Sequence, residues 1–254
     1  MALATIISTG LSSFMVIQSM KKMTDGCRFR WKKIGICWKN LREMLYIGVP
    51  AGISGSCFSL ANILIQSSIN SFGSEVMAGN TAATQWEGFL FVSSTALGHT
   101  MVSFVSQNLG GKQYKRIRES IRYGILFTVC INVFFSIILF VFHQPLLAMF
   151  NADPEVIKYG FIRFSLALPF QWACAIMEIE TGALRGLGLS IGPTLIMIFG
   201  VCIFRIIWIE TVFRYMHSLN VLLASFPISW VLVVLAEWVM LSYVLRKYPL
   251  KNME

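Results

Sequence analysis

Long runs of apolar residues constrain this sequence more than any other feature. Seven such segments cover roughly residues 2–20, 44–70, 77–106, 120–142, 159–182, 191–213 and 219–244. A helix that crosses a bilayer needs about 20 apolar residues, whereas barrel strands are shorter and alternate between polar and apolar residues. We therefore predict an all-α, polytopic membrane protein.

The composition excludes an ordinary soluble enzyme. Charged residues make up 13% of the chain, against about 25% in a typical soluble domain. The sequence has no Walker motif, no H-E-x-x-H and no G-x-S-x-G, so we expect neither an enzyme nor a resident cofactor. None of the six cysteines forms a C-x-x-C pair, so we expect no disulfide framework and assign no metal site.

The distribution of basic residues predicts the orientation of the chain. Of the 21 lysine and arginine residues, 17 fall on one side of an alternating topology, and three fall on the other. The first group lies in the loops 21–42 and 112–122, at Arg185 and in the C-terminal tail; the second comprises Lys158, Arg163 and Arg214. Basic loops stay in the cytoplasm, so we predict a cytoplasmic C-terminus in the plasma or inner cell membrane. Membrane lipid accounts for the basic charge, and we expect no nucleic-acid partner.

The same segments predict the division of the chain. Residues 1–20 are expected to be the tail of a transmembrane helix, 21–43 a basic cytoplasmic linker, 44–245 a six-helix transmembrane lobe and 246–254 a cytoplasmic tail. Asn151 or Asp153 is expected to cap the fifth span, because Pro154 suits a first helical turn.

Several short strings occur together in a recognisable order. They are GVPAG at 48–52, INSFG at 69–73, AGN at 78–80, SQNLGGKQYKRI at 106–117, GALRGLG at 182–188, FRIIWI at 204–209 and FPISW at 226–230. In this order and spacing they resemble the carboxy-terminal half of the multidrug and toxic compound extrusion (MATE) family. The resemblance implies spans seven to twelve of a twelve-span transporter, preceded by the end of span six.

This resemblance implies a function and partners. Members of the family exchange Na⁺ or H⁺ for small organic, often cationic, compounds across a cavity between two lobes. The chain would then need the missing amino-terminal lobe or a partner chain. Two alternatives stay open: a truncated lobe that does not transport, and a lobe of a lipid-linked oligosaccharide flippase of related architecture.

Carboxylates inside a span are costly in a bilayer and therefore mark functional candidates. Glu87 shares a helical face with Asn80, Thr84, Phe91, Ser94 and Gly98, which suits a cavity wall. Glu178 shares a face with Gln171 and Cys174. Both acids are candidates for cation or proton coupling, although Glu87 could equally hold a neighbouring helix. Glu180 and Glu237 are expected to reach the cytoplasmic interface.

Arg205 is the one basic residue that we place deep inside a span, and it is a third coupling candidate. We expect it to form an ion pair with Glu87, which lies at a similar depth. The alternative is that Arg205 stacks on Trp208, one turn away.

A polar stripe in segment two completes the candidate site. Asn62, Gln66 and Asn70 follow one another at helical spacing. They could line a substrate cavity, together with Thr84, Ser94 and Gln171 on other segments. They could equally form hydrogen bonds to neighbouring helices.

Overall fold

The computed structural model describes residues 2–22, 35 and 37–247. The chain divides into two compact units, Met1–Met44 and Leu45–Glu254. The first unit contains α1 (Ala2–Lys22) and the beginning of α2. The second unit is a helical bundle and contains every residue of the candidate site.

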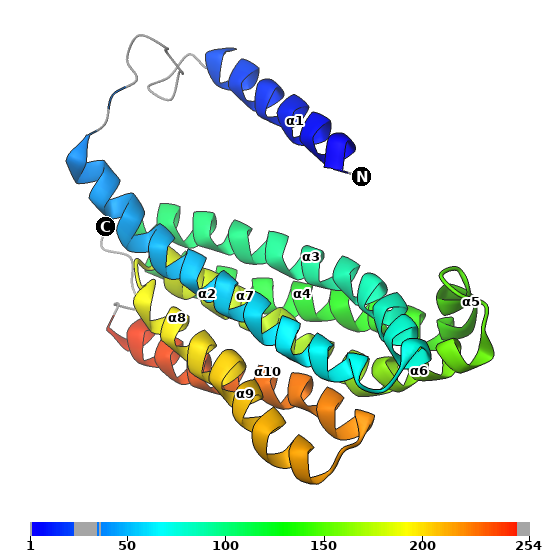
Figure 1. The fold of residues 1–254 in the computed structure, drawn as a ribbon. Helices are drawn as coiled ribbons and strands as arrows, with labels where there is room; N and C mark the ends of the chain where they lie inside the picture. Colours follow the sequence, from blue (N-terminus) through cyan, green and yellow to red (C-terminus); the bar gives the residue numbers. More distant parts are fainter. Residues whose placement is uncertain (1, 23–34, 36, 248–254) are drawn as a thin grey trace. The chain divides into compact units, whose positions relative to one another are not determined.

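The bundle follows the predicted order of spans (Figure 1). Its helical segments are α2 (Trp38–Asn70), α3 (Ser74–Gly110), α4 (Tyr114–Val141), α5 (His143–Ala148), α6 (Pro154–Ala167), the 3-10 turn η2 (Leu168–Phe170), α7 (Gln171–Gly186), α8 (Ile191–Met197), the π-helical turn η3 (Ile198–Ile203), α9 (Phe204–Trp208), the π-helical turn η4 (Ile209–Phe213) and α10 (Leu219–Arg246). Within the described residues, six helices are long and apolar enough to cross a membrane. This confirms the predicted six-helix architecture, and α1 is not among the six.

The fifth span begins as its sequence predicts. Asp153 caps α6, and its carboxylate accepts a hydrogen bond from the backbone N–H of Glu155 at 2.9 Å. Pro154 occupies the first turn, where a missing N–H costs nothing. The η2 turn contains Pro169 and joins α6 to α7, so that Pro154–Gly186 forms one span of 33 residues.

Glycines bring α3 close to α6 and α7. A Cβ atom on Gly98 of α3 would lie 2.8 Å from the carbonyl oxygen of Glu178 on α7. A Cβ atom on Gly182 of α7 would in turn overlap the carbonyl oxygen of Gly98. Near the start of α3 and of α6, Gly79 of α3 faces the backbone of Val156 and Gly160 of α6. Small residues permit such close approach of helices in membranes. These contacts fix the register of α3 against the fifth span, and with it the positions of the side chains between them.

A buried hydrogen bond joins α3 to α4. The Ser94 hydroxyl and the Asn132 amide are both fully buried and lie within 3.0–3.3 Å of each other. Ser94, predicted to line a cavity, therefore bonds to a neighbouring helix, because its side chain points toward α4.

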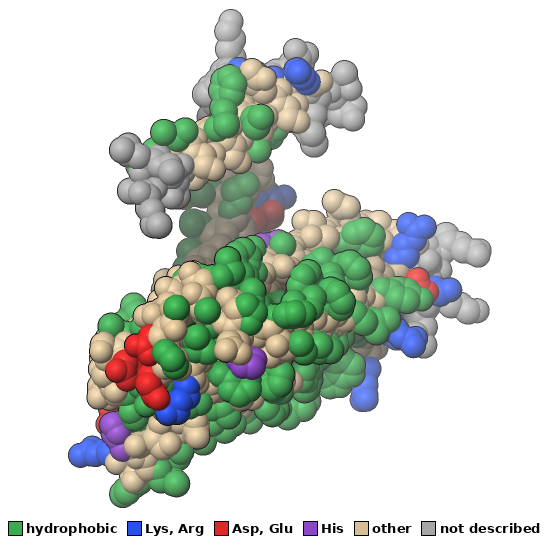
Figure 2. All heavy atoms as spheres, turned by 90° about the vertical axis from the view of Figure 1, so that its right-hand side faces the viewer, with side chains coloured by type: hydrophobic (Ala, Val, Ile, Leu, Met, Phe, Trp, Pro, Cys, Tyr) green, Lys and Arg blue, Asp and Glu red, His purple; other side chains and the backbone are tan. Residues whose placement is uncertain are grey.

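The surface of the bundle suits a lipid environment. On the face in Figure 2, hydrophobic side chains cover the middle of the bundle, and most charged side chains gather toward its two ends. Large apolar side chains of α4, such as Phe127, Phe134 and Ile137, are about 60% exposed. In water these side chains would be unfavourable, but they match the hydrocarbon core of a bilayer.

Candidate cation and substrate site

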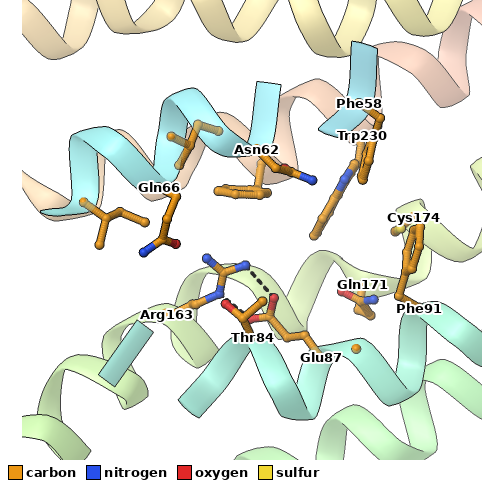
Figure 3. Close-up of a pocket in the computed structure, with 14 residues that line it drawn as sticks. Phe58, Asn62, Gln66, Thr84, Glu87, Phe91, Arg163, Gln171, Cys174 and Trp230 are labelled. Carbon is orange, nitrogen blue, oxygen red and sulfur yellow. Dashed lines mark hydrogen bonds and ion pairs between the residues drawn. The ribbon is translucent and has the colours of Figure 1, made fainter. Parts of the chain in front are cut away.

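A cavity of about 290 Å³ lies between α2 and the helices α3, α6, α7 and α10 (Figure 3). Ligand pockets typically have volumes of about 300–1,000 Å³, so this one is small. Its lining residues are Phe58, Asn62, Ile65, Gln66, Ile69, Thr84, Glu87, Gly88, Phe91, Arg163, Gln171, Cys174, Phe226 and Trp230. Apolar and aromatic side chains thus surround one carboxylate, one guanidinium and a few amides.

Glu87 and Arg163 form a two-pronged ion pair at the wall of this cavity (Figure 3). Arg163 donates from Nε to Oε1 at 2.9 Å and from Nη2 to Oε2 at 2.7 Å. Both residues are buried, with 7% of Glu87 and 5% of Arg163 exposed. Parallel hydrogen bonds of this kind are the strongest that arginine makes with a carboxylate.

The ion pair continues into a chain of amides. Arg163 donates from Nη1 to Oδ1 of Asn80 at 2.8 Å. Asn80 in turn donates to Gln66 at 3.1 Å, and Gln66 donates to Asn70 at 3.2 Å. A change at Arg163 can therefore reach α2 through hydrogen bonds alone. Gln66 lines the cavity, whereas Asn70 is exposed and does not.

Arg205 lies behind the cavity wall and is fully buried. Its Nε and Nη2 donate to the Ser229 hydroxyl at 3.1 and 3.0 Å, and its Nη1 donates to Oδ1 of Asn62 at 2.9 Å. Its guanidinium lies 4.3 Å from the ring centre of Phe226, a ring that Arg163 also contacts at 4.8 Å.

The predicted ion pair between Glu87 and Arg205 is therefore wrong. Arg163 occupies both oxygens of Glu87, and Arg205 makes no salt bridge with any residue in the described part of the chain. The charge count placed Arg163 outside the membrane. However, α6 begins at Pro154, so Arg163 lies more than two turns inside the span, at the level of Glu87. The stacking of Arg205 on Trp208 is not observed either, because Phe226 takes that place.

The other predicted residues divide into two groups. Asn62, Gln66, Thr84 and Gln171 line the cavity. Glu178 is half-buried and lies outside the cavity lining, although Gln171 and Cys174 on the same face belong to it. At Glu178 the backbone of α7 approaches Gly98 of α3.

Sequence reasoning missed Arg163, Phe226 and Trp230. The signal for Arg163 was its distance from the predicted cap at Asp153, which places it inside the fifth span. No comparable signal distinguishes Phe226 or Trp230 from the many aromatic residues that face lipid.

Two polar atoms at this cavity have no partner. Nε1 of Trp230 and Oε1 of Gln171 are buried and make no hydrogen bond, and both residues line the cavity. One is a donor and the other an acceptor, so together they could bond to a bound molecule or to water. Across the described residues, no group of three or more His, Cys, Asp or Glu is arranged to hold a metal ion.

The charges at this site do not cancel. Glu87 neutralises Arg163, and Arg205 adds one positive charge that no described carboxylate pairs with. Glu87 is the one carboxylate among the described residues that line the cavity, so any change in its charge changes the charge that faces the cavity.

Comparison with known proteins decides the family. Residues 50–209 match the family model described as MatE. This chain belongs to the MatE family. Its members are transporters, not enzymes, and the six spans fit a multi-pass membrane protein.

The relatives and the fold agree with this family. The chain is 26% identical to a probable multidrug resistance protein NorM of Thermotoga maritima over 63% of its own length, and 26% identical to the probable multidrug resistance protein YoeA of Bacillus subtilis over 79%. A solved structure of the Vibrio cholerae MATE transporter VcmN, in its bent form, superposes with a TM-score of 0.80 at 20% identity over 97% of this chain.

The chain spans only part of these proteins. The matched regions cover 34% of the Thermotoga protein, 44% of the Bacillus protein and 56% of the Vibrio structure. The MatE match and the multidrug names do not favour the oligosaccharide flippase considered as an alternative.

Proposed function

We propose that this chain is the carboxy-terminal lobe of a cation-coupled antiporter that exports small organic, often cationic, compounds. It would act in the cell membrane, with its C-terminus in the cytoplasm, together with a second six-helix lobe in the same protein or in a partner chain. The observation that carries the proposal is the Glu87–Arg163 ion pair, which is buried inside two membrane spans and faces a cavity. An intramembrane ion pair is expensive and needs a functional reason.

The ion pair offers a mechanism for exchange. A proton or Na⁺ that binds Glu87 cancels its negative charge and leaves Arg163 without a counter-charge. Two unit charges 4 Å apart interact by about 4 kcal/mol at an effective dielectric constant of 20. The freed Arg163 and the nearby Arg205 would then repel an organic cation from the cavity. Return of Glu87 to its ionised form would restore the pair and readmit the substrate.

The aromatic walls support an organic substrate. Phe58 and Phe91 lie nearly parallel, with ring centres 5.8 Å apart, and Trp230 adds a further apolar surface with a free N–H. Flat aromatic compounds gain both burial and stacking energy against such rings. Gln171 could supply the matching acceptor on α7.

The proposal is tested by ethidium efflux from bacteria that lack their own pumps and express a complete transporter containing this lobe. Glu87→Gln should abolish energised efflux, compared at equal amounts of membrane-inserted protein because this variant leaves Arg163 without a counter-charge. Glu75→Gln is the matched control, because Glu75 lies on the same helix but is exposed; it should leave efflux intact.

Normal efflux by Glu87→Gln would contradict the coupling role of Glu87. The ion pair would then only hold α3 to α6. Loss of efflux in both variants would point to a general defect of α3 and would also count against the proposal.

A further inference from the structure

We propose that Glu180 and Glu237 form a second proton-binding site in this lobe, separate from the cavity. Glu180 lies on α7 and Glu237 on α10, and neither lines the cavity described above. Glu180 is nine residues beyond Gln171, which corresponds to about 14 Å along a helix. The pair therefore lies nearer the end of the lobe that carries Arg185 and Arg246.

Glu180 is the most unusual carboxylate in the described part of the chain. It is fully buried, and neither of its carboxylate oxygens has a hydrogen-bond partner. An ionised carboxylate in apolar surroundings is stable only when it is paired and hydrogen-bonded. A proton removes the charge and turns one oxygen into a donor. The surroundings of Glu180 thus suit the neutral acid.

Glu237 is also fully buried, but it has one partner. Both of its oxygens lie within reach of the Thr181 hydroxyl, at 2.7 and 2.9 Å. A hydroxyl donates a single proton, so Thr181 satisfies at most one oxygen of an ionised Glu237. Thr181 follows Glu180 directly in the chain, so Glu237 is bound to the residue next to Glu180.

The charges around this pair do not balance without protons. Glu180, Glu178 and Arg185 lie close enough for their charges to act on the Glu237 carboxyl group. Arg185 is half-buried, its Nε has no partner, and it forms no salt bridge with the described residues. The local set of charged groups therefore comprises one arginine and three carboxyl groups. Two nearby carboxyl groups cannot both ionise at little cost, so a proton on Glu180 or on Glu237 lowers the excess charge.

A proton fits this pair better than a metal ion. The described residues contain no group of three or more His, Cys, Asp or Glu side chains that could hold a metal ion, and a site with two carboxyl groups and one hydroxyl offers few ligands for a hard cation. The binding step is simple: one carboxylate oxygen gains a proton from the aqueous side, and the same O–H bond breaks on release.

The test uses the 254-residue protein, purified in lipid nanodiscs and treated with dicyclohexylcarbodiimide. This apolar reagent attaches to protonated carboxylic acids inside membranes, and mass spectrometry of proteolytic fragments locates the adduct. We expect an adduct on Glu180 or Glu237 that declines as the pH is raised. Glu75 is the internal control: it is exposed at the start of α3, away from apolar surroundings, so it should stay unmodified.

Two variants and one second measurement complete the test. E180Q and E237Q remove one carboxyl group each with little change in shape, and each should lose its own adduct. The infrared spectrum should show a band of protonated carboxylic acid above the pH at which the exposed acids ionise; this band should titrate with pH and be lost in the double variant. An adduct that does not depend on pH, or protection by Na⁺ at constant pH, would overturn the assignment to a proton. Absence of both the adduct and the titrating band would overturn the site itself.

Discussion

Arg163 and Arg205 are two buried arginines in the same lobe with different surroundings. Arg163 donates two hydrogen bonds to the Glu87 carboxylate. Arg205 donates to a serine and an asparagine and lies over the face of Phe226. Removing one partner of a buried ion pair strands the other charge, which is costlier than losing a neutral hydrogen bond. The ion pair should therefore dominate the energetics of this site.

Arg163→Gln should destabilise the lobe by about 3–5 kcal/mol, because Glu87 is left buried without a counter-charge. Arg163→Gln combined with Glu87→Gln should recover much of this loss, since the double variant has no stranded charge. Thermal unfolding of the purified protein measures both effects. The exposed Lys158–Glu155 pair of α6 is the control, and Lys158→Ala should leave the melting temperature unchanged. A double variant no more stable than Arg163→Gln would contradict the pairing.

The position of Glu87 at a cavity wall was predicted from the sequence, whereas its partner was not. An acid in the middle of an apolar run is visible in any sequence, so Glu87 was found without structure. The identity of its partner depends on the depth of each residue within its span, and the charge count assigned Arg163 to the outer side although the predicted segment 159–182 contains it. Glu180 shows the same limit: it lies about two turns from the end of its helix, yet the neighbouring helices bury it fully.

At the scale of helices, the contact between α3 and the fifth span holds Glu87 opposite Arg163. Gly98→Ala should destabilise the lobe by about 1–3 kcal/mol, because the added methyl group overlaps the backbone of α7. Gly88→Ala on the same helix is the control, since nothing lies within 4 Å of its added Cβ. Equal effects of the two variants, measured by thermal unfolding, would contradict the proposed role of this glycine contact.

The helices themselves were largely predictable, because a span must be long and apolar whatever it packs against. Their ends were less so. Segment two was expected from residue 44 but begins at Trp38, and segment three was expected from 77 but begins at Ser74. The helical hydrogen bonds continue into the polar ends of these helices. Hydropathy detects only the apolar residues inside the hydrocarbon, so it does not predict these ends. Ser94 could not be assigned from its face alone, because α4 as well as the cavity offers it hydrogen bonds.

For the whole molecule, the distribution of charge predicts which loops face the cytoplasm. Cys37 should react with a membrane-impermeant thiol reagent only after intact cells are lysed; Cys27, predicted to share this location, lies outside the described residues. Ser218→Cys lies in the loop before α10 and is exposed; it should react in intact cells. The reverse pattern, with Cys37 labelled from outside, would invert the topology.

As a whole, this lobe is proposed to form one wall of a shared transport site. Alternating access requires a second lobe that moves against the first around a common cavity. On its own, the lobe should insert into the membrane but leave the cavity open on one side. Its polar side chains would then meet lipid, which favours self-association.

The most direct measurement is ethidium efflux from drug-sensitive bacteria that express either residues 1–254 alone or the same lobe joined to an amino-terminal MatE lobe. We predict no energy-dependent efflux above the empty vector for residues 1–254. We predict efflux from the two-lobe protein, lost on Glu87→Gln. Energy-dependent efflux by residues 1–254 alone would contradict the need for a different second lobe and would indicate that two copies form the transport site.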